Sequence, residues 1–117
     1  MPALNFKKQF ADAVESGQKR QTIRADRKDG RNPKPGDKLY LYTGMRTKGC
    51  RKLKEAECKS VERIVIEEFN IIVGVNVLDI DEKYALAKAD GFHYIDDFRN
   101  FFLKTHDLPF YGFLIKW

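Results

Sequence analysis

The sequence predicts a single α+β domain in which a small curved or barrel-like sheet of about five to six strands is flanked by three helices. Its 117 residues are enough for one hydrophobic core and leave no room for a second. Several segments alternate between apolar and polar residues, as half-buried strands do, and three others carry apolar residues at helical spacing. Short turn sequences join the central strands, which favours pairing around one sheet.

The first helix is predicted over residues 5–16. Apolar side chains recur there at helical spacing, as Phe6, Phe10 and Val14 illustrate, and charged residues occupy the other faces. Gly17 follows, and glycine reaches the left-handed conformation that ends many helices without steric cost. The helix is therefore expected to stop just before Gly17.

A short strand is predicted over residues 21–25, because Thr22 and Ile23 are both β-branched. Side chains two positions apart share one face of a strand, so Thr22 and Arg24 are expected on the same face. Residues 26–36, which are charged and contain prolines and glycines, are expected to form a loop.

Further strands are predicted in the middle of the chain. The turn sequence Pro35-Gly36-Asp37 leads into an alternating strand over residues 38–42, and a basic loop is expected over residues 43–54. A long strand with a bend or bulge is predicted over residues 55–67. The β-branched segment 71–78 is expected to return antiparallel to it.

The last part of the chain is predicted to contain two helices and a strand. Asp79 or Asp81 can cap a helix that runs through Ala89 and ends at Asp90-Gly91. A second helix is predicted to start near Ile95, because Phe98, Phe101 and Phe102 recur at helical spacing, and to end before Asp107–Pro109. A closing strand is predicted over residues 111–117.

Charge is distributed unevenly along the chain, whose formal net charge is +5. Residues 19–54 contain thirteen Lys or Arg residues against three Asp, whereas residues 55–117 carry a net charge of −5. If residues 19–54 fold as one side of the domain, they form a contiguous positive surface. We interpret this segment as a surface for a polyanion such as RNA, the alternative being a charge cluster that serves solubility.

Cys50 and Cys58 lack the spacing of a zinc or redox motif. The histidines, at positions 93 and 106, lack metal-ligand spacing to them, so the sequence predicts reduced cysteines, no metal and no cofactor. No apolar run approaches the roughly 20 residues that span a bilayer, and the N-terminus has no apolar signal segment. We therefore expect a cytoplasmic protein without a membrane partner; its oligomeric state stays open.

The segment from Gly17 to Arg24 holds the first candidate site. Lys19 lies beside other cations, and a partly buried lysine in such surroundings can lose its proton near neutral pH and act as a general base. Thr22 offers a hydroxyl that can attack or orient a substrate, and Arg24 can hold a phosphate or carboxylate through two hydrogen bonds. From the residue chemistry alone, a surface turn with solvated cations is the simpler interpretation.

The basic segment that follows the strand over residues 38–42 holds the second candidate site. Cations in a flexible loop neutralise phosphates, and a tyrosine ring can stack on a nucleic-acid base. Packing within the sheet is the alternative role for the tyrosine. The candidate RNA-binding residues here are Tyr42, Arg46, Lys48, Arg51 and Lys52.

Three motifs occur together in this chain and resemble those of the ASCH domain, a relative of the PUA RNA-binding fold. The resemblance covers roughly residues 4–117 and extends to the loop over residues 43–48. It implies that residues 1–117 form a single ASCH domain, with a PUA-like β-barrel flanked by helices and a cleft that takes RNA. The motifs are Gly17-x-Lys19-x-x-Thr22-Ile23-Arg24, Pro35-Gly36-Asp37-x-Leu39-x-Leu41 and Asp90-Gly91-Phe92.

One branch of the ASCH family hydrolyses the acetyl amide of N4-acetylcytidine with a lysine, a threonine and a glutamate. The resemblance places Lys19 on the lysine and Thr22 on the threonine. It places Asp90, whose side chain is one methylene shorter, near the glutamate. Another ASCH protein cleaves single-stranded RNA. Because Asp90 directly precedes Gly91, ending the helix and satisfying local backbone donors is the alternative role for its carboxylate.

The sequence therefore leaves three alternative functions for this chain. The first is binding of RNA or a modified nucleoside in a basic cleft lined by Lys19, Thr22, Arg24 and Arg46. The second is a metal-independent hydrolase, either an amidohydrolase or a ribonuclease, in which Lys19 activates Thr22 or water and Asp90 transfers the proton. The third is a protein-interaction domain whose basic face docks an acidic partner.

Overall fold

The computed structural model describes residues 3–117 and confirms the predicted α+β class. These residues form three helices and eight strands, and the strands fall into two sheets. In chain order the elements are β1 (Ala3–Phe6), α1 (Lys8–Ser16), β2 (Gln21–Ala25), β3 (Lys38–Thr43), β4 (Arg51–Glu57), β5 (Ser60–Ile66), β6 (Ile71–Val73), β7 (Asn76–Val77), α2 (Ile80–Ala89), α3 (Ile95–Thr105) and β8 (Phe110–Lys116).

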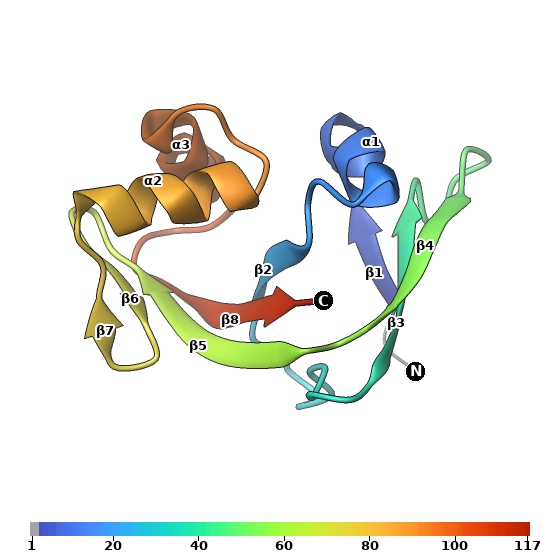
Figure 1. Ribbon diagram of the computed structural model, residues 1–117, viewed down its shortest axis with the longest axis horizontal. Helices are drawn as coiled ribbons and strands as arrows, with labels where there is room; N and C mark the ends of the chain where they lie inside the picture. The colour runs from blue at the N-terminus through green and yellow to red at the C-terminus, as the bar shows by residue number, and fades with distance from the viewer. Residues whose placement is uncertain (1–2) are drawn as a thin grey trace.

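The larger sheet has five strands in the order β2-β8-β5-β6-β7, and all of its neighbouring strands are antiparallel. The smaller sheet has the order β1-β3-β4, in which β1 runs parallel to β3 and β3 antiparallel to β4. β4 and β5 follow one curved path from the smaller sheet to the larger one (Figure 1). α2 and α3 lie on the side of β6, α1 lies on the side of β4, and β2 runs between these two groups of helices (Figure 1).

Local hydrogen bonds fix one end of α1 and one end of α2. Gly17 has a φ of 86°, and its N–H donates to the carbonyl of Val14, so α1 ends on a left-handed glycine as predicted. The Asp79 carboxylate accepts from the N–H of Glu82, and the Glu82 carboxylate accepts from the N–H of Asp79. This capping box starts α2, which then ends at Asp90.

Aromatic side chains of α1 and α3 pack together in the core. The ring centroid of Phe10 lies 5.4 Å from that of Phe92 and 6.0 Å from that of Phe101. Phe98 and Phe102 are buried on the same helix as Phe101. Edge-to-face contacts of this kind add to the free energy gained by burying the rings. The contact between Phe10 and Phe101 joins α1 to α3, although α1 lies on the side of β4 and α3 on the side of β6.

The helix predicted over residues 5–16 starts later, at Lys8, because β1 occupies the preceding residues. The local sequence pattern does not predict β1. Leu4 of β1 lies opposite Leu41 of β3, and Leu4 and Phe6 are both buried. Pairing with a strand that is distant in the sequence therefore overrides the helical spacing that Phe6 shares with the residues after it.

The strand predicted over residues 55–67 is divided in two at Cys58. The N–H of Cys58 donates to the carbonyl of Asp37 at 2.7 Å, next to the pairing of β4 with β3. The N–H of Lys59 donates to the carbonyl of Lys116 at 2.8 Å, next to the pairing of β5 with β8, so the chain passes from one sheet to the other at this point. β4 already begins at Arg51, so the basic loop predicted over residues 43–54 is confined to residues 44–50. The strand pairing of β3 with β4 accounts for the difference.

The strand predicted over residues 71–78 is also divided, because the chain turns at Gly74, which has a φ of 61°. Its two halves, β6 and β7, pair with each other, and β6 pairs antiparallel with β5 as expected. Together with β1, these two divisions raise the number of strands in residues 3–117 to eight, above the five or six predicted. The closing strand is β8, which lies between β2 and β5.

Three further observations concern groups that the sequence analysis considered. Cys50 is exposed, Cys58 is buried, and both are free thiols, as predicted. None of the helices within residues 3–117 combines the length and the apolar character needed to cross a membrane. The same residues contain no group of three or more His, Cys, Asp or Glu side chains arranged to hold a metal ion.

Candidate functional site

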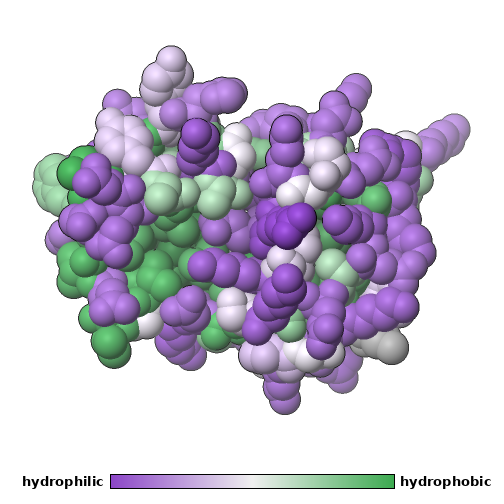
Figure 2. All heavy atoms as spheres, viewed as in Figure 1, coloured by the Kyte–Doolittle hydropathy of each residue, from purple (hydrophilic) through white to green (hydrophobic). Residues whose placement is uncertain are grey.

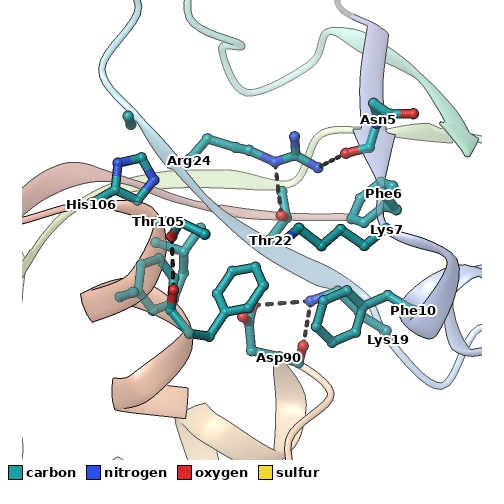
Figure 3. Close-up of a pocket in the computed structure, with 14 residues that line it drawn as sticks. Asn5, Phe6, Lys7, Phe10, Lys19, Thr22, Arg24, Asp90, Thr105 and His106 are labelled. Atoms are coloured by element: carbon teal, nitrogen blue, oxygen red, sulfur yellow. Dashed lines mark hydrogen bonds and ion pairs between the residues drawn. The ribbon is translucent and has the colours of Figure 1, made fainter. Parts of the chain in front are cut away.

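A cavity of about 400 Å³ opens between the β1–α1 junction, β2 and the C-terminal part of α3. Lys19, Thr22 and Arg24 line it from the segment that follows α1, Asp90 lines it from the end of α2, and His106 lines it from the end of α3 (Figure 3). We call it the Lys19 cavity. It gathers side chains from parts of the chain that are far apart in the sequence.

Lys19 and Asp90 form an ion pair in the wall of this cavity (Figure 3). The Lys19 Nζ lies 3.1 Å from the Asp90 Oδ1 and also donates to the Asp90 carbonyl oxygen at 2.6 Å. The two side chains are only 3% and 7% exposed, whereas the other ion pairs within residues 3–117 lie at the surface. Burying two charges is costly, so a buried pair beside a cavity is a candidate for function more than for stability.

Burial shifts the two charged groups in opposite directions. It lowers the pKa of Lys19 below the ordinary lysine value, because water no longer solvates the ammonium. It raises the pKa of Asp90 above the ordinary aspartate value for the same reason. Each partner's charge offsets part of the other's shift. The difference between the two pKa values is therefore smaller than in water, which lowers the cost of moving a proton between the amine and the carboxylate.

Hydrogen bonds to the helix ends hold this pair in place. The N–H of Lys19 donates to the carbonyl of Ala13 at 2.9 Å, and the N–H of Asp90 donates to the carbonyl of Leu86 at 3.0 Å. The buried amide of Gln21 lies 3.4 Å from both the Asp90 Oδ1 and the Leu86 carbonyl oxygen. Gln21 therefore supports the orientation of the Asp90 carboxylate, a role that its position in the sequence does not indicate.

Thr22 and Arg24 share one face of β2, as the alternation predicts. The Arg24 Nε donates to the Thr22 Oγ1 at 3.0 Å, and the Arg24 Nη2 donates to the carbonyl of Asn5 at 2.6 Å (Figure 3). The guanidinium carbon lies 4.8 Å from the ring centroid of Phe6. Burial lowers the pKa of Arg24 to about 10, so its guanidinium is still charged at neutral pH. The Thr22 hydroxyl is thus held beside a fixed positive charge.

Aromatic rings form the apolar part of the cavity wall. Phe6 and Phe10 come from β1 and α1, and Phe101 comes from α3. The Lys19 Nζ lies 4.9 Å from the ring centroid of Phe10, and the Lys7 Nζ lies 4.8 Å from that of Phe101. These distances are within the range of cation–π attraction. The cavity is therefore lined by aromatic rings as well as by hydrogen-bonding groups.

The first candidate set is brought together, but the second is dispersed. Arg51 lines a neighbouring cavity of about 620 Å³. Arg46 and Lys48 are exposed on the loop between β3 and β4, and Arg46 does not line the Lys19 cavity in which the sequence analysis placed it. Tyr42 and Lys52 line neither cavity, and Lys52 instead pairs with an acidic neighbour on β4.

Lys7, Phe101 and His106 line the cavity without having been predicted as site residues. Phe101 and Thr105 are four positions apart, a spacing that puts both on one face of α3. Nothing in the sequence indicates that this face borders a cavity, because α3 meets α1 and β1 only in the folded chain. His106 follows the end of α3, with its ring centroid 4.7 Å from that of Phe110.

Comparison of the chain with models of protein families, with curated proteins and with solved structures found no match. The resemblance to the ASCH domain therefore stays a prediction drawn from the sequence motifs. The functional interpretation rests on the geometry of the Lys19 cavity and on the chemistry of the groups that line it.

Proposed function

We propose that this chain is an ASCH-type, PUA-like domain that binds RNA or a modified nucleoside in the Lys19 cavity. One observation carries the proposal: the aromatic residues Phe6, Phe10 and Phe101 line the same cavity as Lys19, Thr22 and Arg24. A base can pack against the rings while its edge or a sugar hydroxyl meets the polar groups. The volume, about 400 Å³, lies within the range typical of small-molecule sites.

The relation between the two sheets supports the PUA-like part of this proposal. The guanidinium groups of Arg24 and Arg27 donate to the carbonyls of Asn5 and Ala3 on β1, at 2.6 and 3.5 Å. Side chains thus bridge β2 and β1 where no strand pairing joins them. On this proposal the bridge stands in for one seam of the barrel, and the Lys19 cavity opens beside it.

Binding can be tested by titrating the protein with N4-acetylcytidine, cytidine and a short single-stranded RNA. We expect saturable binding of at least one ligand, and affinity for RNA that falls steeply with salt, because phosphate contacts release counterions. Arg24→Lys keeps the charge but loses the N–H donors that hold the Thr22 hydroxyl and the Asn5 carbonyl, and is expected to weaken binding about tenfold. Weak RNA binding that salt does not change, together with no nucleoside binding, would favour a protein partner instead.

Hydrolysis of an N-acyl nucleoside is the second candidate function, and the buried contact between Lys19 and Asp90 favours it. In this reaction the neutral Lys19 amine accepts a proton from the Thr22 hydroxyl or from water, and the resulting oxygen nucleophile attacks the acetyl carbonyl. The proton that Lys19 accepts passes through the Asp90 carboxylate to the departing N4 amine, which leaves as cytidine. Where water attacks, acetate is released in the same step. Where Thr22 attacks, the acetyl group is left as an ester on Thr22, and a water that Lys19 deprotonates then hydrolyses this ester to acetate. One water is consumed in either route.

The hydrolase candidate is tested by incubating the protein with N4-acetylcytidine and with end-labelled single-stranded RNA. Chromatography then detects cytidine and acetate, and electrophoresis detects shortened RNA. Lys19→Ala is expected to abolish turnover of whichever substrate reacts. Turnover that survives this substitution would exclude Lys19 as the base, and the absence of turnover in the wild-type protein would leave binding as the function.

A further inference from the structure

A second cavity adjoins the Lys19 cavity at the β1–α1 junction. Its volume is about 620 Å³, and the two cavities share Asn5, Phe6 and Lys7 as lining residues. Beyond these, the second cavity is lined by the first turns of α1, by Thr43 and by the loop over residues 44–50, and we call it the loop cavity. A ligand that fills the Lys19 cavity therefore meets the loop cavity directly at the junction.

The charges that line the loop cavity favour an anion. Lys7, Lys8 and Arg51 face it, against a single carboxylate, that of Asp12. The Arg51 Nη1 lies 2.7 Å from the Glu15 Oε2, but these side chains are 50% and 47% exposed. An exposed ion pair contributes little free energy, so a ligand anion can take the place of the Glu15 carboxylate at small cost.

Two polar side chains stand at the boundary between the cavities. The Lys7 Nζ reaches the ring of Phe101, so this side chain extends from the junction across the Lys19 cavity toward α3 (Figure 3). The Asn5 Oδ1 accepts from the N–H of Met45, which leaves the amide nitrogen of Asn5 as a donor. The Lys7 ammonium and the Asn5 amide thus come from residues that line both cavities, and donors of these two kinds suit the oxygen atoms of a phosphate group.

The wall of the loop cavity is preformed. The Thr47 hydroxyl donates to the carbonyl of Gly44 at 2.6 Å and accepts from the N–H of Gly49 at 3.1 Å. Gly44 has a φ of 65°, and a Cβ at this position would lie 2.9 Å from the carbonyl oxygen of Gly49, so only glycine fits the closed loop. A loop that is already ordered loses little entropy when a ligand binds.

We infer that the loop cavity binds a phosphate group carried by the nucleoside that occupies the Lys19 cavity. This inference rests on the proposed function. The Asn5 amide contacts the phosphate oxygens at the boundary, the Lys7 ammonium approaches them from the Lys19 cavity, and Lys8 and Arg51 neutralise the remaining charge. The ligand class is a nucleoside phosphate, in which the phosphate is either terminal or links the nucleoside to the next nucleotide of a strand.

Isothermal titration of the full chain at one ionic strength tests the inference. The ligands are N4-acetylcytidine, its 5′- and 3′-monophosphates and a dinucleotide that contains it. We expect one monophosphate to bind at least about tenfold more tightly than the nucleoside. Further tightening with the dinucleotide would identify a strand as the source of the phosphate, and equal affinity would identify a terminal phosphate.

Lysine variants assign the gain to the loop cavity. Lys8→Met is expected to lower the ratio of the monophosphate and nucleoside affinities several-fold, because it removes one of the cations that line the loop cavity. Lys52→Met is the matched control, since Lys52 is also an exposed lysine of the basic half of the chain but lines neither cavity. It is expected to keep the full ratio. An equal loss in both variants would reduce the effect to general charge and overturn the inference.

The wild-type titrations separate the inference from the function on which it rests. Equal affinity for the nucleoside and both monophosphates would overturn the phosphate site and leave nucleoside binding in place. Failure of all four ligands to bind would overturn the proposed function itself. Tight binding of a monophosphate when the free nucleoside binds too weakly to measure would support the inference most strongly.

Discussion

Lys19 and Asp90 are 71 positions apart in the sequence, yet the ammonium of one lies 3.1 Å from the carboxylate of the other. The contact joins the turn after α1 to the end of α2, so it exists only when both helices are in place. A buried ion pair usually stabilises a protein no more than two apolar side chains of similar size would. Stability and activity should therefore respond differently to its removal.

Lys19→Met is expected to lower the free energy of unfolding by about 3 kcal/mol, because it leaves the Asp90 carboxylate buried without its cation. The double variant Lys19→Met/Asp90→Leu removes both charges and should recover most of this loss, although it is inactive. Urea unfolding followed by the fluorescence of Trp117, which is buried in the folded chain, measures both variants. A double variant as unstable as the single one would show that the pair itself stabilises the fold.

Hydrolysis of N4-acetylcytidine is expected to accelerate with rising pH and to level off below the ordinary lysine pKa of 10.5. The reason is that the neutral amine is the active form of Lys19, and burial lowers the pKa of this group. In Asp90→Asn the rising limb of the profile should move to still lower pH. The Asp90 charge raises the Lys19 pKa, so without this charge the desolvation of Lys19 lowers its pKa further. Profiles of kcat/KM between about pH 5 and 10 measure both positions.

If Asp90→Asn is inactive, NMR titration of the Lys19 side chain in the ligand-free protein gives the same comparison. A limb, or a Lys19 titration, that moves to higher pH in this variant would contradict the assignment of Lys19 as the base. So would a wild-type profile that is flat across the range.

Thr22→Val is expected to lower kcat at least about 100-fold, because it removes the hydroxyl that attacks or orients the substrate while keeping the shape of the side chain. It also leaves the Arg24 Nε without its partner, so the free energy of unfolding should fall by about 1 kcal/mol. Thr22→Ser should retain most of the activity. Thr105→Val is the matched control: Thr105 lines the same cavity, but its hydroxyl donates to the carbonyl of Phe101 within α3. Equal rates in both valine variants would remove Thr22 from the reaction.

Most of the secondary structure follows from local patterns, and the exceptions have long-range causes. Gly17 and Asp79 act as the helix end and the helix cap that their residue types predict. β1 is different, because Leu4 and Phe6 become a strand only by pairing with β3. The break at Cys58 likewise depends on a hydrogen bond to Asp37, in a turn twenty-odd positions earlier in the chain. Local propensity carries no information about such partners.

The candidate site divides in the same way. Lys19, Thr22 and Arg24 lie within one short segment, so strand alternation is enough to put two of them on one face. The contact of Lys19 with Asp90 was implied only by the resemblance to the ASCH domain, since no local rule relates residues so far apart. The high density of cations in residues 19–54 did not indicate which way each side chain points. Lys52, which was predicted to bind RNA, lines neither cavity.

Gly91→Ala tests whether the backbone next to Asp90 is fitted to the site. Gly91 has a φ of 101°, and a Cβ there would lie 2.9 Å from the Phe10 Cδ1 and 3.6 Å from the Lys19 Cδ. Alanine therefore adds both backbone strain and a clash with the ring that walls the cavity. Gly36→Ala is the matched control, because Gly36 has a similar φ of 92° but no atom within 4 Å of an added Cβ.

We expect Gly36→Ala to cost about 1 kcal/mol of unfolding free energy, the strain of a left-handed alanine. Gly91→Ala should cost about 1–3 kcal/mol more, because Phe10 must move. The displaced ring lies against the Lys19 ammonium, so ligand affinity should fall in Gly91→Ala and stay unchanged in Gly36→Ala. Denaturant unfolding and titration with N4-acetylcytidine measure the two effects. If the two variants lose equal stability and both bind normally, the Phe10 ring moves aside at no cost. The close contact of Gly91 with Phe10 then has no part in shaping the Lys19 cavity.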